Sequence, residues 1–167
     1  MNIEHQILLK VRKVSKIHPG GEKFFDALDR EIIENASDEV IESLLSHVPT
    51  KHFIVLSGGF GKKIAEKIDS GEISFTPYIL FKGGIRSGGS PEIIRKTSLH
   101  GKRAIFLDDS IYGGATYLTI KQFLAKEMKI TIKKCAVIYD GCPVKKDDIV
   151  SLFRYYDHYK TTSNFKF

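Results

Sequence analysis

Four short, continuous apolar runs constrain the fold of this chain more than any other feature of its sequence. They occupy residues 53–56, 78–81, 104–107 and 135–139. Continuous apolar runs of this length are typical of parallel strands that are buried on both faces. A glycine-containing turn and then a helical repeat follow the first and the third run. The pattern predicts an α/β fold, an open and mostly parallel sheet with flanking helices, whose ligands bind at the carboxyl ends of the strands.

The first 50 residues follow a different pattern. Apolar residues stand at every second position at Ile7, Leu9 and Val11, which predicts a short strand. Apolar residues recur at helical spacing over 24–33 and again over 40–45. We therefore expect two amphipathic helices, with Ser37 as the N-cap of the second.

The segment near the end of the chain is rich in aromatic and basic residues over 152–159. We expect an edge strand here that packs Leu152 and Phe153 inward. Stacking of its aromatic rings on a base or on single-stranded nucleic acid is the alternative. The acidic pair 147–148 follows the lysine pair 145–146 in an expected surface turn, and we assign it no chemistry.

The composition of the chain limits the class of protein that it can be and the kind of partner that it can bind. The 167 residues carry a net charge of +6, which favours an anionic partner, either nucleic acid or a small polyphosphate, with a solvated basic surface as the alternative. No apolar run approaches the roughly 20 residues of a membrane span, and the first residues lack a signal-peptide core, so we expect a cytoplasmic protein without a membrane partner. Cys135 and Cys142 do not form a CxxC pair and the histidines are scattered, so neither a disulfide framework nor a structural zinc site is expected.

The segment 103–116, Arg-Ala-Ile-Phe-Leu-Asp-Asp-Ser-Ile-Tyr-Gly-Gly-Ala-Thr, carries the most specific chemical signal. The expected strand ends in two adjacent carboxylates, Asp108 and Asp109, and a tight glycine turn then opens a helix that extends to about residue 128. Backbone N–H groups at such a turn, together with the positive end of the helix, form a cradle for phosphate. Thr116 can add a hydroxyl or cap the helix. Carboxylates beside a phosphate cradle suit a sugar phosphate, whose hydroxyls they can accept from, or a bridging divalent metal.

This segment, with its lead-in at 99–102, resembles the 5-phosphoribosyl 1-pyrophosphate (PRPP) signature of type I phosphoribosyltransferases. The resemblance implies a Rossmann-like core over about 52–140 and a small hood built from 1–50 and 140–167, within a single domain that spans 1–167. It also implies a homodimer. The alternative is a generic nucleotide-like α/β turn whose acids are surface caps.

The resemblance implies a role for each part of the segment. Asp108 and Asp109 would be the catalytic acids, which hold the ribose 2′- and 3′-hydroxyls and help to place Mg²⁺ indirectly, through those hydroxyls or water. The 5-phosphate would be wrapped mostly by backbone amides, in the run Ile111, Tyr112, Gly113, Gly114, Ala115 and Thr116.

Two further loops take roles by the same resemblance. The pyrophosphate loop would be Ser57, Gly58 and Gly59. The segment 82–90 would be a flexible loop that closes over the reaction, with Lys82 and Arg86 as pyrophosphate clamps. An ordinary surface loop is the alternative for 82–90.

Three departures from the family pattern bear on activity. Tyr112 stands where enzymes that act on 6-oxopurines carry an acid, which disfavours hypoxanthine and guanine and leaves pyrimidines open. A turn residue that packs on the loop is the alternative for Tyr112. Gly113 stands where most members have Thr, and the loop 57–61 lacks the basic residue of several members. Whether these changes preserve turnover is left open.

We therefore expect an enzyme, a magnesium-dependent phosphoribosyltransferase of nucleotide metabolism. It would transfer 5-phosphoribosyl from PRPP to a nucleobase or similar nitrogen acceptor and release pyrophosphate. The alternative is a catalytically weak or inactive regulatory protein that senses PRPP or a nucleotide and binds nucleic acid or a protein partner.

Overall fold

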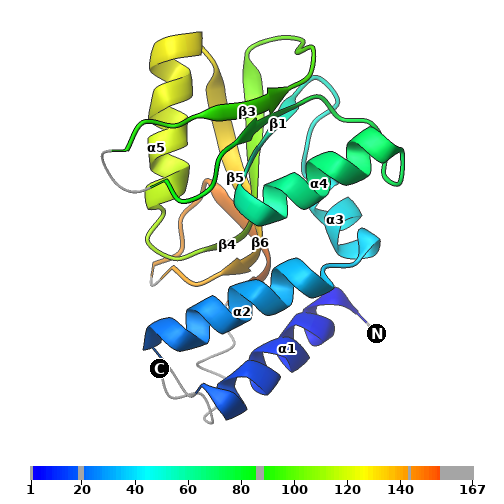
Figure 1. The fold of residues 1–167 in the computed structure, drawn as a ribbon, viewed down its shortest axis with the longest axis vertical. Helices are drawn as coiled ribbons and strands as arrows, with labels where there is room; N and C mark the ends of the chain where they lie inside the picture. The colour runs from blue at the N-terminus through cyan, green and yellow to red at the C-terminus, as the bar shows by residue number, and fades with distance from the viewer. Residues whose placement is uncertain (1, 19–20, 86–88, 143, 155–167) are drawn as a thin grey trace.

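A six-stranded sheet forms the centre of the molecule in the computed structural model, which describes residues 2–18, 21–85, 89–142 and 144–154 (Figure 1). The strand order is β3-β2-β1-β4-β5-β6. Every neighbouring pair is parallel except β2 and β3. The strands are β1 (Phe53–Ser57), β2 (Tyr78–Phe81), β3 (Ile93–Lys96), β4 (Arg103–Ile111), β5 (Thr131–Asp140) and β6 (Ile149–Arg154). The predicted open, mostly parallel sheet is confirmed, with β3 as an unpredicted antiparallel edge strand.

Helices cover both faces of this sheet (Figure 1). They are α1 (Ile3–Ile17), α2 (Gly21–Asn35), α3 (Asp38–Leu45), α4 (Gly58–Ser70) and α5 (Ala115–Phe123), which a π-helical turn, η1 (Leu124–Met128), continues. Residues of β1 alternate between two cores: Ile54 and Leu56 pack with α1 to α4, and Phe53 and Val55 pack with α5. Among the described helices, none is both long and apolar enough to cross a membrane.

The strand predicted over residues 7–11 is wrong, because this segment lies in α1. Ile7, Val11 and Val14 are buried in the core while Leu9 is 42% exposed. A strand would have placed Ile7, Leu9 and Val11 on one face, whereas a helix turns Leu9 away from the other two. The apolar residues of the longer segment recur every three to four positions, and this helical pattern outweighs the short strand-like pattern within it.

The other expectations for the N-terminal segment are confirmed. The helices predicted over 24–33 and 40–45 are α2 and α3. The Ser37 hydroxyl oxygen accepts a hydrogen bond of 3.3 Å from the backbone N–H of Val40, as expected of an N-cap.

The expected C-terminal edge strand is confirmed as β6 as far as Arg154, and residues 155–159 lie outside the described residues. Phe153 is buried and stacks on Tyr139 with 5.8 Å between ring centroids.

The topology brings the ends of β1 and β4 together. These strands are parallel neighbours, with Val55 opposite Phe106. Two residues later, β1 ends at Ser57 and β4 reaches Asp108, so both positions lie at the carboxyl edge of the sheet. Helices α4 and α5 begin at this same edge, which is where ligands bind in open α/β sheets.

Candidate functional site

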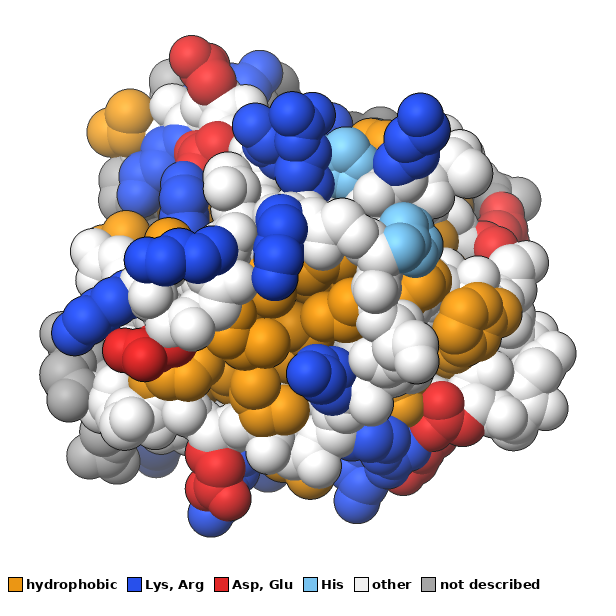
Figure 2. Space-filling model, turned by 90° about the horizontal axis from the view of Figure 1, so that it is seen from above, with side chains coloured by type: hydrophobic (Ala, Val, Ile, Leu, Met, Phe, Trp, Pro, Cys, Tyr) orange, Lys and Arg blue, Asp and Glu red, His pale blue; other side chains and the backbone are white. Residues whose placement is uncertain are grey.

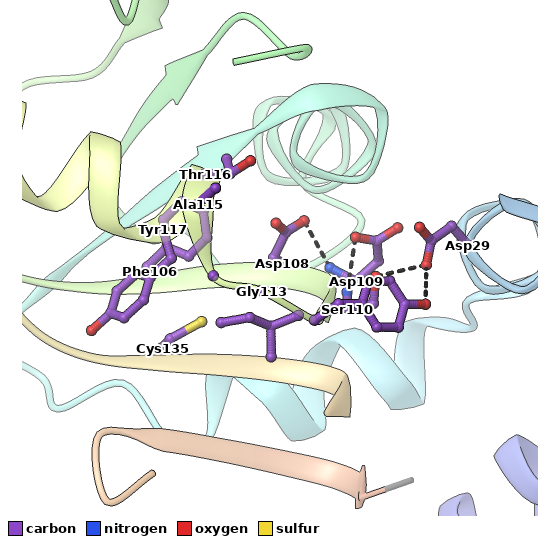
Figure 3. Close-up of a pocket in the computed structure, with 13 residues that line it drawn as sticks. Asp29, Phe106, Asp108, Asp109, Ser110, Gly113, Ala115, Thr116, Tyr117 and Cys135 are labelled. Atoms are coloured by element: carbon purple, nitrogen blue, oxygen red, sulfur yellow. Dashed lines mark hydrogen bonds between the residues drawn. The ribbon is translucent and has the colours of Figure 1, made fainter. Parts of the chain in front are cut away.

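A cavity of about 330 Å³ lies at the carboxyl end of β4 (Figure 3). It is lined by every residue from Asp108 to Tyr117, together with Phe106, Cys135 and Asp29. The structure therefore brings together the predicted site residues Asp108, Asp109 and Ile111 to Thr116. It places the two carboxylates within β4 rather than after the strand, because β4 continues to Ile111.

The two adjacent carboxylates are poorly hydrated. Asp109 is buried and Asp108 is half-buried. Each accepts a hydrogen bond from the next backbone N–H, 2.9 Å from Asp109 to Asp108 and 2.8 Å from Ser110 to Asp109. Burial raises the pKa of both groups, and the charge of Asp109 adds to the rise at Asp108. A cation or a hydrogen-bond donor that binds in the cavity would stabilise the charged forms of these two carboxylates.

A third carboxylate, Asp29 of α2, faces the same cavity (Figure 3). Its Oδ1 accepts two hydrogen bonds, 2.6 Å from the Ser110 hydroxyl and 2.9 Å from the Tyr112 hydroxyl. Burial raises the pKa of Asp29 to about 6, and the charge of Asp109 adds to this effect. Asp29 was not among the predicted site residues, and its only signal in the sequence is a position beside Leu28 on the buried side of α2.

Tyr112 is held by packing on both sides of its ring. A Cβ on Gly141 would lie 2.4 Å from that ring, so the close approach requires glycine. The ring of Tyr139 meets it edge to face, with 6.1 Å between centroids. Tyr112 therefore packs on its surroundings, as one reading of the sequence expected, and also joins the turn to Asp29 of α2.

The turn between β4 and α5 has no side-chain cap on the backbone N–H groups that begin the helix. Gly114 adopts φ +81° at the N-cap of α5, no side chain caps this helix, and its first turn carries no acid. A Cβ on Gly113 would meet nothing within 4 Å, so a larger residue would fit there. The Lys146 Nζ lies 3.9 Å from the place a Cβ on Gly114 would occupy. Sequence analysis expected Lys146 in a surface turn and missed its position beside this glycine.

The turn between β1 and α4 shares the lack of a side-chain cap, although its N-cap residue is extended rather than left-handed. Ser57 is buried at the N-cap of α4 without a side-chain hydrogen bond to the helix, and the first turn again has no acid. A Cβ on Gly83 would lie 2.8 Å from the Gly58 Cα, so the loop after β2 packs directly against this turn. Space is open beside Gly59.

Not all predicted residues meet in one cavity. Ser57, Gly58, Gly59 and Lys82 do not line the cavity of 330 Å³. Lys82 is exposed, with its Nζ 3.8 Å from a Glu92 carboxylate oxygen. The predicted clamp Arg86 lies outside the described residues.

The carboxyl oxygens at this edge are of the kind that Mg²⁺ prefers. Among the described residues, however, no three Asp, Glu, His or Cys side chains are arranged to hold a metal ion directly. The carboxylates of Asp108 and Asp109 are oxygen donors that fit a magnesium ion whose other ligands come from a bound molecule or water.

Comparison with known proteins finds similarity in structure but no match to a family model or to a curated sequence. Adenine phosphoribosyltransferase from Thermoanaerobacter pseudethanolicus is 17% identical, with 78% of this chain and 81% of that chain covered and a TM-score of 0.48. Orotate phosphoribosyltransferase from Aeropyrum pernix is 13% identical, with 79% and 80% covered and a TM-score of 0.48.

A hypoxanthine phosphoribosyltransferase from Staphylococcus aureus is 16% identical, with 75% and 74% covered and a TM-score of 0.46. Because the sequence identity and the structural overlap are low, the activity of this chain has to be inferred from the chemistry of its own site. The chain is similar in structure, over about three quarters of its length, to phosphoribosyltransferases.

Proposed function

We propose that this protein is a magnesium-dependent phosphoribosyltransferase, which transfers 5-phosphoribosyl from PRPP to a nitrogen acceptor with release of pyrophosphate. One observation carries the proposal. The carboxylates of β4 stand at the sheet edge where two helices begin, α4 and α5, and neither helix has a side-chain cap or an acid in its first turn. Anions bind at such helix ends, and carboxylates accept from hydroxyls.

PRPP has this arrangement of charge. It carries one anionic group at each end of a ribose, whose two hydroxyls lie between them. We assign the 5-phosphate to the turn 111–116, with Lys146 as an additional cation, and the pyrophosphate to the turn 57–59. Asp108 and Asp109 then accept hydrogen bonds from the ribose hydroxyls, which relieves the crowding that raises their pKa.

The chain's own residues orient the ribose for substitution at C1. Because the transition state at C1 has oxocarbenium character, the protein needs to position and stabilise charge rather than to supply a nucleophile. The α4 N-terminus faces the developing charge of the departing pyrophosphate. Magnesium, when bound, would neutralise the pyrophosphate oxygens and improve the leaving group.

Calorimetric titration of PRPP with Mg²⁺ into the wild type and into the Asp108→Asn/Asp109→Asn variant tests the binding step. We expect micromolar binding by the wild type and a loss of about 100-fold or more in the variant, since two charge-assisted contacts disappear. Pyrophosphate release with a panel of bases then tests transfer. A folded wild type that does not bind PRPP, with or without Mg²⁺, would overturn the proposal.

One observation supports the regulatory alternative. At the opposite edge of the sheet, seen in Figure 2, an apolar patch has several Lys and Arg side chains along its rim, most of them on one side. A hollow of about 650 Å³ includes Leu99, Met128, Lys96 and Lys102. Such a surface suits an anionic partner. RNA binding that falls steeply with salt, together with PRPP binding and no pyrophosphate release, would favour a sensor over an enzyme.

A further inference from the structure

We infer that the Asp29 carboxylate recognises the acceptor by accepting a hydrogen bond from its N–H, so that the site takes neutral nitrogen bases and rejects anionic ones. This inference rests on the proposed function and adds the class of its second substrate.

The two oxygens of Asp29 have different surroundings. Oδ1 accepts from both the Ser110 and the Tyr112 hydroxyls. Among the described residues, none donates a hydrogen bond to Oδ2, although Asp29 is a wall of the cavity (Figure 3). Two fixed donors on one oxygen orient the carboxylate and leave the other oxygen for a ligand. A half-buried carboxylate oxygen with no hydrogen-bond donor costs free energy unless a donor arrives.

The position of Asp29 matches that of an acceptor. Its two partners, Ser110 and Tyr112, follow closely after Asp109 in the chain, so Asp29 faces the segment that we assign to the ribose and its 5-phosphate. A base that attacks ribose C1 has to lie beside that ribose. The α2 carboxylate is placed to contact such a base from the side of the N-terminal helices.

The carboxylates of the cavity account for the selectivity between neutral and anionic acceptors. Asp29, Asp108 and Asp109 lie around one cavity, and among the ion pairs of the described residues none involves any of them. An acceptor that carries its own carboxylate would add a fourth carboxylate to this cavity and repel the other three. A neutral base with an N–H would instead supply the donor that Oδ2 lacks. A site built around such a hydrogen bond discriminates strongly against ligands that cannot make it.

The test compares uracil, adenine and orotate as acceptors for the wild type and Asp29→Asn, with PRPP and Mg²⁺. Orotate is uracil with a carboxylate added, so the pair isolates the effect of charge. The Asn amide oxygen can still accept from Ser110 and Tyr112, while its NH₂ replaces Oδ2 with a donor. Glu34→Gln removes an exposed charge from the same helix and is the matched control.

We expect the wild type to use a neutral base and to reject orotate. In Asp29→Asn, kcat/KM for that neutral base should fall about 100-fold, and the disadvantage of orotate should shrink, while PRPP affinity stays within about twofold. Tyr112→Phe, which keeps the Asp29 charge and removes one orienting donor, should cause a smaller loss in the same direction. It is the second variant if Asp29→Asn fails to fold.

The outcomes separate the two proposals. If the wild type does not bind PRPP, the proposed function fails. If PRPP binds normally but the wild type prefers orotate, uses neither neutral base, or shows the same acceptor preference after Asp29→Asn, the inference about Asp29 is wrong and the proposed function stands.

Discussion

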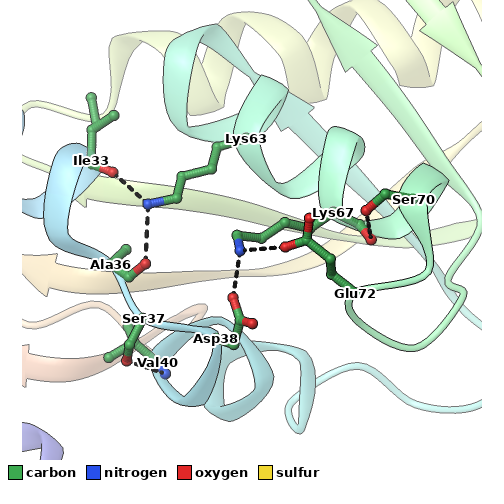
Figure 4. A network of polar contacts seen from close by, with 9 residues as sticks. All are labelled: Ile33, Ala36, Ser37, Asp38, Val40, Lys63, Lys67, Ser70 and Glu72. Carbon is green, nitrogen blue, oxygen red and sulfur yellow. Dashed lines mark hydrogen bonds and ion pairs between the residues drawn. The ribbon is translucent and has the colours of Figure 1, made fainter.

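Two polar networks join the N-terminal helices to the rest of the molecule, and their charges are balanced differently. Where α2 and α3 meet α4, Lys67 pairs with Asp38 at 2.6 Å and with Glu72 at 2.9 Å (Figure 4). Lys63 donates to the backbone oxygens of Ile33 at 2.9 Å and Ala36 at 3.0 Å. In the cavity at the end of β4, three carboxylates instead share one space (Figure 3), where they accept hydrogen bonds from two hydroxyls and two backbone N–H groups, and no ion pair among the described residues involves them.

This difference distinguishes polar residues that hold the fold together from polar residues that are arranged for a ligand. The network around Lys63 and Lys67 satisfies its donors and acceptors within the chain, so its purpose is to hold the helices in place. The carboxylates of the cavity are destabilised by burial and by one another, which raises their pKa values. A protein retains such an arrangement where a ligand supplies the missing donors or cation. Substitutions in the two networks should therefore affect stability and binding in opposite ways.

The largest effect on stability is expected at Lys63. Lys63→Met removes the donor to two carbonyls at the end of α2 and should lower the free energy of unfolding by about 2–3 kcal/mol, measured by denaturant titration. PRPP affinity should not change. Lys62→Met, at an exposed position of the same helix, is the control. Loss of PRPP binding in a folded Lys63→Met protein would contradict the division between the networks.

Asp29→Asn should stabilise the protein at neutral pH. Because the pKa of Asp29 is raised from 3.8 to about 6 in the fold, the folded chain binds more protons than the unfolded chain between those values. The free energy of unfolding of the wild type therefore falls as pH rises through that window. With screening allowed for, the variant should exceed the wild type by about 1–2 kcal/mol at pH 7. Thermal unfolding should show this advantage disappear by about pH 4; an advantage that is independent of pH would mean that the Asp29 charge is not its cause.

Lys146→Met should weaken PRPP binding by about 3–10-fold, since it removes one cation near the phosphate turn while the backbone donors remain. Calorimetry at two salt concentrations should show a weaker salt dependence in the variant than in the wild type. Lys145→Met, at the neighbouring exposed position, provides the comparison. Equal losses in both variants would indicate a general effect of charge rather than a contact at Gly114.

The smallest effect is expected from Asp38→Asn. The Asp38 side chain is 53% exposed in its pair with Lys67, and exposed ion pairs contribute little to stability. The change in unfolding free energy should be near the resolution of a denaturant titration and should vanish in about 1 M salt. A large loss that persists in salt would mean that this network holds the helices more firmly than its exposure implies.

The local sequence was sufficient to predict those elements whose structure depends on residues that are close together in the chain. Buried strands need continuous apolar side chains, so β1, β2, β4 and β5 could be predicted. The positive φ of Gly114 and the start of α5 likewise follow from residues that are adjacent in the chain. The exception is α1, where a short alternation over 7–11 hid a longer helical repeat.

Only the tertiary structure completed the site. Asp29 precedes Ser110 by 81 residues, and its position beside Leu28 is too weak a signal to single it out from the other acids of α2. Its role depends on which side of α2 packs on the sheet, and that packing is decided by the buried residues of the whole core. The sequence by itself determined the four buried strands β1, β2, β4 and β5, the two glycine turns and the carboxylates Asp108 and Asp109, because short-range geometry and patterning suffice for these. Docking of distant elements decided that Asp29 and Lys146 join them, because contacts between side chains far apart in the chain exist only once the sheet and its helices have packed.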